Sequence, residues 1–374
     1  MTLYFDYNAT TPLAPEVLDA MLPYLSGNFA NPSSLHLPGR MAREGIERAR
    51  DQVADFLNAH PSQIVFTSGG TEANNLAIKG VVKGMAISQL FVSAIEHPSV
   101  YEIANYFKGA LSVNYLGVDA LGYINQSQLP DLSLSPSLVS VMYANNESGV
   151  IQDVKAIADL VRQAGHIFHT DAVQAVGKCS VDYEELGAHL MTLSSHKIYG
   201  PKGVGALVYD KSLDIEPLVH GGAQENGLRS GTENVAAIVG FGHAAELAKK
   251  NELENQEKLK ALRDYFEEKL KELVGVIIFS ENAKRLVNTT YFSVLGVDGE
   301  TLLMQLDEQG ISVTSGSACS SKTGNPSHVL LAMGTDEEVA RSAIRVSFGL
   351  QNTKADVDIL IKVLNTRIES LVTA

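Results

Sequence analysis

Short apolar stretches recur along the first two thirds of the chain, and most of them end in small or polar residues. They predict six strands, at residues 63–70, 90–97, 138–146, 166–173, 189–197 and 205–210. Helical patterns lie between several of these strands; in one of them a single face carries Ile46, Ala49, Val53, Phe56 and Leu57. Strands that alternate with helices predict an α/β fold whose mostly parallel sheet is covered on both faces. Ligands of such sheets bind at the carboxyl ends of the strands, where the polar residues lie.

The pattern changes after about residue 245. Residues 248–273 are highly charged but carry apolar residues at helical spacing, which predicts a long surface helix leading into a second domain. Residues 288–321 mix strand patterns with one helix, and residues 355–372 predict a closing amphipathic helix.

Composition narrows the class of protein. The 374 residues are 45% hydrophobic, which is enough for a sizeable core. Lysine and arginine number 29 against 43 acidic residues, so the net charge of −14 argues against direct binding to nucleic acid or to an acidic membrane surface. We find no secretory signal pattern and no apolar run near the ~18 residues of a membrane span. Two cysteines, far apart in sequence, fit a reducing compartment and predict a cytoplasmic protein without a disulfide framework.

Residues 67–80, TSGGTEANNLAIKG, read as a strand that enters a glycine-rich turn, with a helix starting near Thr71 and Glu72. Backbone N–H groups and the helix dipole favour an anion at such a turn. The same pattern is equally compatible with an ordinary connection between a strand and a helix.

Two further stretches carry candidate chemistry. In HTDAVQAVGK, Asp171 and Gln174 follow a strand, where an acid can also serve as a helix cap. In SSHKIYGPKG, Lys197 ends an apolar run after short donor residues, whereas Lys202 lies in a Gly/Pro turn and is expected to be exposed. Pyridoxal phosphate needs a lysine amine for its aldehyde, a carboxylate for its pyridine nitrogen and a phosphate cup. We therefore expect Lys197 to be the Schiff-base lysine of this cofactor.

The chain resembles the pyridoxal-phosphate-dependent cysteine desulfurases of the class V aminotransferase group, in particular the branch with the longer catalytic loop. The resemblance runs from YFDYNATTP near the start to RVSFG near residue 349, in the family's order and approximate spacing. It is carried by the motifs TSGGTEANN, EHPSV, NNESGVIQDV, HTDAVQAVG, the lysine stretch, RSGTENVA and TSGSACSS.

The resemblance implies a role for each motif residue at the cofactor. Lys197 would form the Schiff base, Asp171 would keep the pyridine nitrogen protonated, and Gln174 would bond the ring hydroxyl. His97 would stack on the ring and transfer protons, although a lone histidine at a strand end is also compatible with a core residue. The phosphate cup would be built by Gly70, Thr71, Ser194 and His196.

The substrate groups follow from the same resemblance. Asn146 and Arg345 would hold the substrate carboxylate, which an arginine matches with its planar fork; an interdomain salt bridge is the alternative for Arg345. Thr232 would reach the phosphate of a neighbouring subunit, which implies a homodimer. No metal ligand set is expected, because two cysteines cannot supply the roughly four ligands of an iron–sulfur cluster.

Cys319 would decide the reaction. It lies among small and polar residues, and the family resemblance implies that its thiolate accepts the sulfur of L-cysteine, leaving L-alanine and a protein persulfide. The sulfur would pass to an acceptor such as an iron–sulfur scaffold protein, for iron–sulfur clusters, thiolated cofactors or tRNA. Only Lys322 is a nearby charge in sequence, so activation of the thiol through His97 is a hypothesis. Cys179 lacks such surroundings and is interpreted as structural.

Two other functions remain open on these residues. An aminotransferase or selenocysteine lyase of the same fold would share Lys197 and Asp171, but transamination needs no thiol. A catalytically silent partner protein would not need the lysine, aspartate and arginine set. The resemblance implies the aspartate-aminotransferase type of fold, with a large cofactor-binding domain at residues 15–248. Residues 1–14 and 249–374 would form the small domain that carries Cys319 and Arg345.

Overall fold

The computed structural model describes residues 2–129, 136–315 and 325–372. Within these ranges the largest sheet has seven strands in the order β2-β8-β7-β6-β5-β3-β4. The strands span Ile64–Thr67 (β2), Gln89–Ser93 (β3), Ser112–Leu116 (β4), Ser137–Ser140 (β5), Ile167–Asp171 (β6), Leu190–Ser194 (β7) and Gly205–Tyr209 (β8). All neighbours from β7 to β4 pair in parallel, and β8 runs antiparallel to β7 and β2. The predicted mostly parallel sheet is confirmed.

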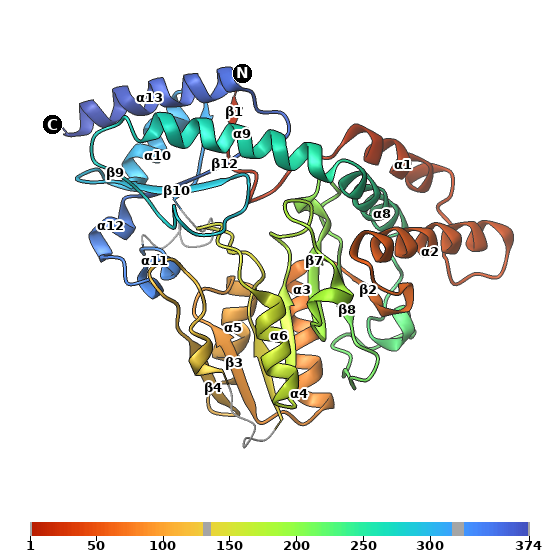
Figure 1. Cartoon of the computed structure of the whole chain (residues 1–374). Coiled ribbons are helices and arrows are strands. Elements are labelled where there is room, and N and C mark those ends of the chain that lie inside the picture. The colour runs from red at the N-terminus through yellow and green to blue at the C-terminus, as the bar shows by residue number, and fades with distance from the viewer. Residues whose placement is uncertain (1, 130–135, 316–324, 373–374) are drawn as a thin grey trace.

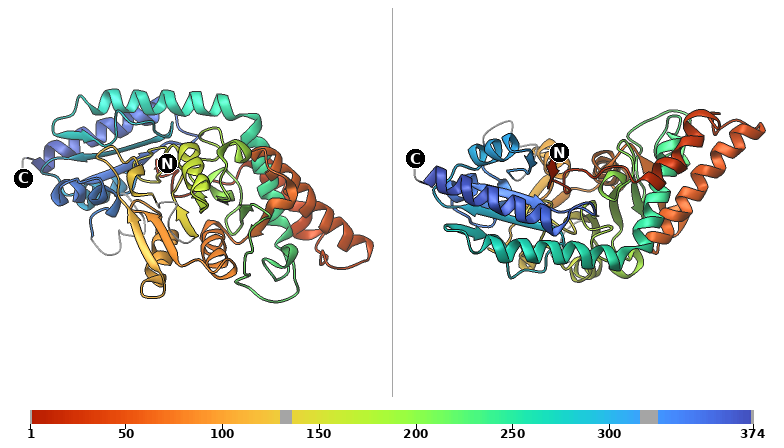
Figure 2. Two further views of the ribbon diagram at one scale, coloured as in Figure 1. Left: turned by 60° about the horizontal axis from the view of Figure 1, so that its bottom comes forward. Right: turned by 90° about the horizontal axis from the view of Figure 1, so that it is seen from above.

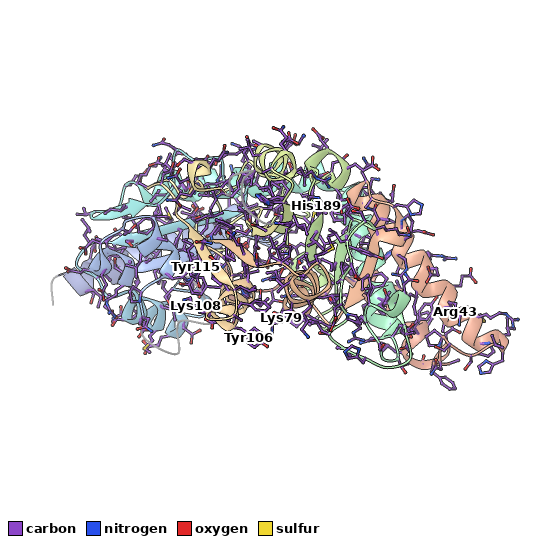
Figure 3. All side chains as sticks on the ribbon, turned by 90° about the horizontal axis from the view of Figure 1, so that it is seen from below. Arg43, Lys79, Tyr106, Lys108, Tyr115 and His189 are labelled. Atoms are coloured by element: carbon purple, nitrogen blue, oxygen red, sulfur yellow. The ribbon has the colours of Figure 1, made fainter. Side chains whose placement is uncertain are left out.

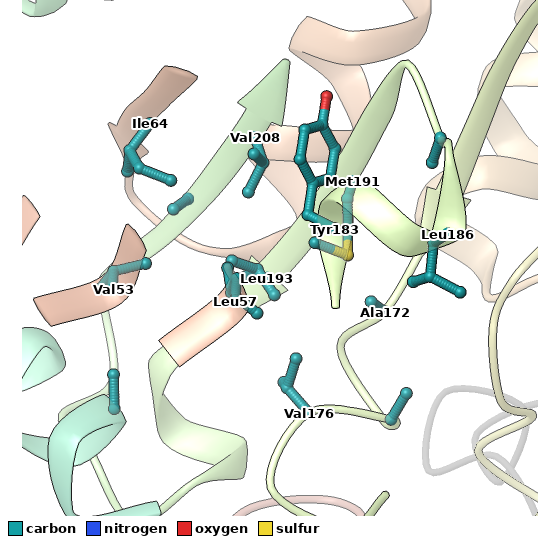
Figure 4. Close-up of a cluster of buried hydrophobic side chains, with 14 of the residues drawn as sticks. Val53, Leu57, Ile64, Ala172, Val176, Tyr183, Leu186, Met191, Leu193 and Val208 are labelled. Carbon is teal, nitrogen blue, oxygen red and sulfur yellow. The ribbon is translucent and has the colours of Figure 1, made fainter. Parts of the chain in front are cut away.

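Both faces of this sheet are buried, so its strands are apolar without alternation. On β2, Ile64 and Phe66 pack in one hydrophobic cluster and Val65 packs in the other. The first cluster is covered by α2, α6, α7 and α8, which span Leu37–Leu57, Val154–Gln163, Tyr183–Leu186 and Val235–Lys250. Figure 4 shows part of it, where Val53 and Leu57 of α2 meet Leu193 and Val208 of the strands.

The second face is covered by the helical stretch after β2 and by α5. That stretch runs through α3 (Gly70–Asn75), a π-helical turn (Leu76–Gly80) and α4 (Val81–Gly84), and α5 spans Pro98–Phe107. The outer strand β4, which the sequence analysis did not predict, is an exposed edge. Tyr115 of β4 lies under Lys108, whose Nζ is 5.0 Å from the ring centroid, and Lys79 lies similarly over Tyr106 (Figure 3). Lys108 therefore places a positive charge beside the edge strand, which opposes its pairing with other chains.

α1 (Pro15–Ser26) and α2 project from one end of the molecule (Figure 2). The predicted apolar face of α2 is confirmed, since Ile46, Ala49, Val53 and Leu57 are buried. The helix starts earlier than the apolar pattern, at Leu37, where Pro38 and the capping His36 side chain begin the first turn. It ends at Asn58 in the left-handed conformation.

A separate layer is built from the last third of the chain. The strands β9 (Val276–Ile278), β10 (Thr289–Val294) and β12 (Ala343–Ser347) form an antiparallel sheet in the order β12-β10-β9. Helices α9 (Glu252–Leu270) and α13 (Lys354–Val372) run along it, as Figure 1 shows. The remaining elements of this layer are α10 (Gly299–Glu308), β11 (Ile311–Ser312), α11 (His328–Ala332) and α12 (Glu337–Arg341).

The single long helix predicted over residues 248–273 is wrong in one respect. The chain forms two helices there, α8 and α9, which are separated at Asn251. The predicted apolar positions of the second helix are correct, because Leu259, Leu262, Phe266 and Leu270 are buried.

The first residues of the chain join the C-terminal layer. Strand β1 (Leu3–Tyr4) pairs in parallel with β11, Phe5 lies in the same hydrophobic cluster as α9 and α13, and Asn8 N–H donates to Ser347 Oγ at 3.0 Å. This arrangement is compatible with the expected grouping of residues 1–14 with 249–374, which stays a prediction. No helix among the described residues is both long and apolar enough to cross a bilayer.

Candidate active site

A cavity of about 260 Å³ lies at the carboxyl ends of β6 and β7. It brings together ten of the predicted site residues: Gly70, Thr71, His97, Asn146, Asp171, Gln174, Ser194, His196, Lys197 and Arg345. The sequence analysis missed six lining residues: Asn8, Ala9, Asn74, Ser99, Met142 and Val173. Asn8 and Asn74 lie within the motifs YFDYNATTP and TSGGTEANN, so their polar side chains in these motifs were the signal that could have marked them as site residues.

Asp171 is the last residue of β6, and it is buried with 5% of its surface exposed. Its Oδ2 accepts a hydrogen bond from Asn74 Nδ2 at 2.8 Å, and its Oδ1 accepts one from the N–H of Val173 at 2.9 Å. A carboxylate has about four acceptor sites. Asp171 is therefore held in place while it retains the capacity to accept a further donor from the cavity.

His97 is the N-cap of α5, because its Nδ1 accepts the N–H of Ser99 at 3.1 Å. Since Nδ1 is the acceptor, the proton of the neutral ring belongs on Nε2. Burial lowers the pKa of His97, and the nearby Asp171 carboxylate opposes this only in part. His97 thus lines the cavity as a neutral imidazole.

Lys197 lies in a short 3-10 turn, Ser195–Lys197, that follows β7. The lysine is half-buried, and its Nζ donates to the backbone oxygens of Asn8 and Ala9, at 2.8 Å for Ala9. Lys202 is exposed, as expected from its Gly/Pro turn. Lys197 is therefore the lysine of the two that faces the cavity of Asp171.

The residues expected to hold a phosphate gather at one end of the cavity. Gly70 and Thr71 begin α3, where the first N–H groups of a helix have no partner within the helix. Gly205 permits close packing here, because an added Cβ would lie 2.8 Å from the Cα of Gly69. A second hollow shares Gly70, Thr71, Ser194 and His196 with the cavity and also includes Lys202.

This end of the cavity is electropositive. Burial lowers the pKa of His196 to about 4, and the charges of Lys197, Lys202 and Lys178 act in the same direction. Lys197 and Lys202, which line the two hollows beside this imidazole, favour an anion over a cation at this position.

Arg345, on β12, is 2% exposed and enters the cavity from the C-terminal layer. Its Nη1 donates to the backbone oxygen of Asn146 at 2.8 Å, and its Nη2 pairs with Asp6 Oδ1 at 2.6 Å. Its buried Nε has no hydrogen-bond partner in the part of the chain that the structure describes. A buried guanidinium that lines a cavity is suited to a carboxylate ligand.

Two predicted residues lie outside this cavity. Thr232 is exposed and does not line it, and its expected contact with a neighbouring subunit stays a prediction. Cys319 and Lys322 lie outside the described residues.

Cys179 behaves as a structural cysteine. It packs against the hydrophobic cluster under α2 and α8, and its Sγ donates to the backbone oxygen of Ala175 at 3.5 Å. Burial raises the pKa of its thiol to about 12. A thiol with so high a pKa is a poor nucleophile near neutral pH.

Residues 3–360 match the family model of the class-V aminotransferases. Cysteine desulfurase IscS of Dictyoglomus turgidum is 44% identical over 374 residues, which cover 99% of this chain and 95% of the relative. The chain belongs to the cysteine desulfurase family. Among solved structures, the NifS-like protein of Rickettsia africae is 37% identical with a TM-score of 0.89, covering 99% of this chain and 100% of that one. A structure described as SspA in complex with cysteine is 35% identical with a TM-score of 0.81, covering 93% and 99%.

The cofactor of cysteine desulfurases is pyridoxal phosphate, and the residues of this cavity fit it. The buried Asp171 carboxylate is held by two donors and lies in the same cavity as the Lys197 amine. This carboxylate and this amine are the two groups that the cofactor's ring nitrogen and aldehyde require. The helix start at Gly70 and the surrounding lysines supply the anion site that the phosphate group requires.

Proposed function

We propose that this cavity is where the enzyme converts L-cysteine to L-alanine and passes the sulfur to Cys319. The observation that carries the proposal is that Lys197, Asp171 and His97 line one cavity that Arg345 enters from the opposite layer. A lysine amine, a fixed carboxylate and a neutral imidazole are the groups that an enzyme of this cofactor uses for binding and proton transfer.

Each residue has a defined task in this proposal. Bound pyridoxal phosphate supplies the electron sink that weakens bonds at the substrate's Cα and Cβ. Lys197 would hold the cofactor through its amine, and Asp171 would accept a hydrogen bond from the protonated ring nitrogen and so keep it protonated. His97 is neutral with its proton on Nε2, so it is able to move protons near neutral pH.

The substrate is oriented from the other side. The Arg345 guanidinium would bind the substrate carboxylate, and Asn146 lines the same cavity. This arrangement directs the thiol-bearing end of L-cysteine away from Arg345. The solved relative that contains cysteine supports this substrate.

In this proposal, sulfur passes from L-cysteine to Cys319. The C–S bond of L-cysteine breaks and its sulfur forms an S–S bond with the thiolate of Cys319. The substrate Cβ takes a proton, so the products are L-alanine and a persulfide on Cys319. The persulfide sulfur then passes to an acceptor such as an iron–sulfur scaffold protein, for clusters or for thiolated cofactors and tRNA.

We propose a homodimer as the working form. Large apolar side chains are exposed on α1, on the segment between α1 and α2, and on the first turns of α2: Leu18, Leu22, Leu25, Phe29, Leu35, Leu37 and Met41. Exposed apolar surface of this extent favours a protein interface. Thr232 is also exposed, so a second subunit is able to reach it. A cytoplasmic location stays a prediction from the sequence.

The test is alanine release from L-cysteine by the purified holoenzyme, with Cys319→Ala and Cys179→Ser as a matched pair. We expect the wild type and Cys179→Ser to form alanine and a protein persulfide. Cys319→Ala should keep its cofactor and form neither. Equal activity of Cys319→Ala and the wild type, or formation of pyruvate or a keto acid in place of alanine, would refute the proposal.

A further inference from the structure

Lys178 is a buried lysine that the roles above leave unexplained. It is 6% exposed and lies four residues after Gln174, in the turn that follows β6. Its Nζ donates to Gln174 Oε1 at 2.6 Å and to Asn8 Oδ1 at 2.9 Å. Burying an amine costs free energy unless its hydrogen bonds are made, so these two contacts account for how the chain tolerates it.

These contacts fix the side-chain amide of Gln174. Its Nε2 donates to the backbone oxygen of Asn8 at 2.9 Å, and a carbonyl oxygen accepts only from a donor. Its Oε1 faces Lys178. The amide therefore has one orientation, in which one of the two Nε2 hydrogens bonds Asn8 and the second remains available to the cavity.

Hydrogen bonds also fix the orientation of the Asn8 side-chain amide. Its Oδ1 accepts from Lys178 and from Asn288 Nδ2 at 3.1 Å, and its Nδ2 donates to Thr289 Oγ1 at 2.8 Å. The backbone oxygen of Asn8 also accepts from Lys197. Lys178 thus bonds both Asn8, whose backbone oxygen accepts from Lys197, and Gln174, which lines the cavity.

The charged groups around Lys178 do not explain its presence. Burial lowers the pKa of Lys178 well below its usual value, and the like charges of Lys197 and Arg345 add to this. Whether the amine is charged or neutral, it keeps the two N–H groups that Gln174 and Asn8 receive.

We infer that Lys178 is a positioning residue. It holds the side-chain amide of Gln174 so that an N–H group, and not the amide oxygen, faces the ring hydroxyl of the cofactor. The inference rests on the proposed function, because it takes Gln174 as the neighbour of that hydroxyl. Without Lys178, Oε1 of Gln174 would be buried without a donor, and the amide would rotate to find one.

The experiment compares Lys178→Met, Gln174→Met and the double variant as holoenzymes. The measured quantity is the pH at which the visible absorption of the bound cofactor changes. A donor on the ring oxygen competes with that oxygen's bond to the protonated Lys197 nitrogen. Loss of the donor should therefore move the transition to higher pH by about one unit.

The double variant separates positioning from charge. We expect Lys178→Met to move the transition as far as Gln174→Met does, and the double variant to move it no further. Lys178→Arg, which keeps the donors, should restore the wild-type transition, and Lys211→Met at an exposed site should leave it unchanged. A wild-type transition in Lys178→Met, or an equal further shift in the Gln174→Met background, would overturn the inference.

A measurement on the unmodified chain covers the case in which Lys178→Met does not fold. In protein labelled with ¹⁵N-glutamine, the side-chain amide signal of Gln174, assigned by its loss in Gln174→Met, should move when the cofactor binds. An unmoved signal would overturn the inference. If the wild type itself fails to link the cofactor to Lys197, the proposed function fails first, and the inference falls with it.

Discussion

Asn74 donates a 2.8 Å hydrogen bond to the carboxylate of Asp171 and so connects α3 to the last residue of β6. Asn74 is 1% exposed, and its Nδ2 also donates to Ser99 Oγ at 2.9 Å, beside the His97 cap. One amide thereby links α3, β6 and the start of α5 at the cavity.

Asn74→Ala should lower the kcat of alanine release about tenfold, because a hydrogen bond to a charged group contributes roughly 1.5 kcal/mol or more. The adjacent Asn75→Ala is the matched control, since the Asn75 amide bonds only the backbone oxygen of Thr71 among the contacts described. Steady-state kinetics with a cofactor absorption spectrum measure both. An unchanged kcat in Asn74→Ala would show that Val173 alone is enough to hold Asp171.

Lys197→Ala should abolish the covalent cofactor link, whereas Lys202→Ala should keep it, because Lys197, unlike Lys202, lines the cavity of Asp171. Borohydride reduction followed by peptide mass spectrometry locates the linked lysine. A cofactor fixed to any lysine other than Lys197 would contradict the assignment.

Arg345→Ala should raise the KM for L-cysteine at least tenfold and leave the cofactor spectrum unchanged. The reason is that a charge-assisted bond to the substrate carboxylate is lost, while Lys197 and Asp171 stay in place. Kinetics and spectra of Arg345→Ala and Arg345→Lys check this. Arg345→Lys keeps the positive charge but loses the planar guanidinium, so its KM should lie between those of the wild type and Arg345→Ala. A normal KM in Arg345→Ala would restrict the arginine to its ion pair with Asp6.

Cys179→Ser should leave kcat and KM within about twofold of the wild type, since the Cys179 thiol is buried with a pKa of about 12. Alanine release and thiol titration of the folded and unfolded protein check this. A folded but inactive Cys179→Ser protein would give Cys179 a chemical role.

Acidification should destabilise the fold through His169. Its ring is fully buried between Ser140 and Thr192, and burial lowers its pKa to about 3. An unfolded histidine titrates near pH 6.5, so the unfolded chain takes up the proton first. Stability is therefore full above about pH 6.5 and falls as the pH drops towards 3.

The measurement is the free energy of unfolding at pH 8 and pH 5 in the wild type and in His169→Gln. The histidine should account for about 2 kcal/mol of the difference between the two pH values. His169→Gln should lose that part of the pH dependence, whatever its stability at pH 8. An identical pH dependence in both proteins would refute this role of His169.

The sequence predicted the sheet well because its strands are buried on both faces and therefore read as short apolar runs. β4 was missed because its half-exposed residues Ser112 to Leu116 lack such a run. The break at Asn251 was missed because the charged pattern continues across it.

The residues that line the cavity were predictable where one motif supplied one residue, as with Lys197, Asp171 and His97, while their roles stay predictions. The contacts that hold these residues were not, because they join distant parts of the chain. Asn8, for example, meets Gln174, Lys178, Asn288 and Thr289 through hydrogen bonds that no local pattern indicates.

The attachment of the first residues to the last third of the chain has a consequence for biosynthesis. Leu3 pairs with Ile311, and Asn8 bonds Ser347, so the segment that receives Lys197 has only part of its contacts, such as those with Gln174 and Lys178, until the ribosome has released nearly the whole polypeptide. At a synthesis rate of about 5–20 residues per second, that interval lasts tens of seconds. The cofactor pocket is thus among the last parts of the nascent protein to mature, and a truncated chain that stops before β12 should emerge without it.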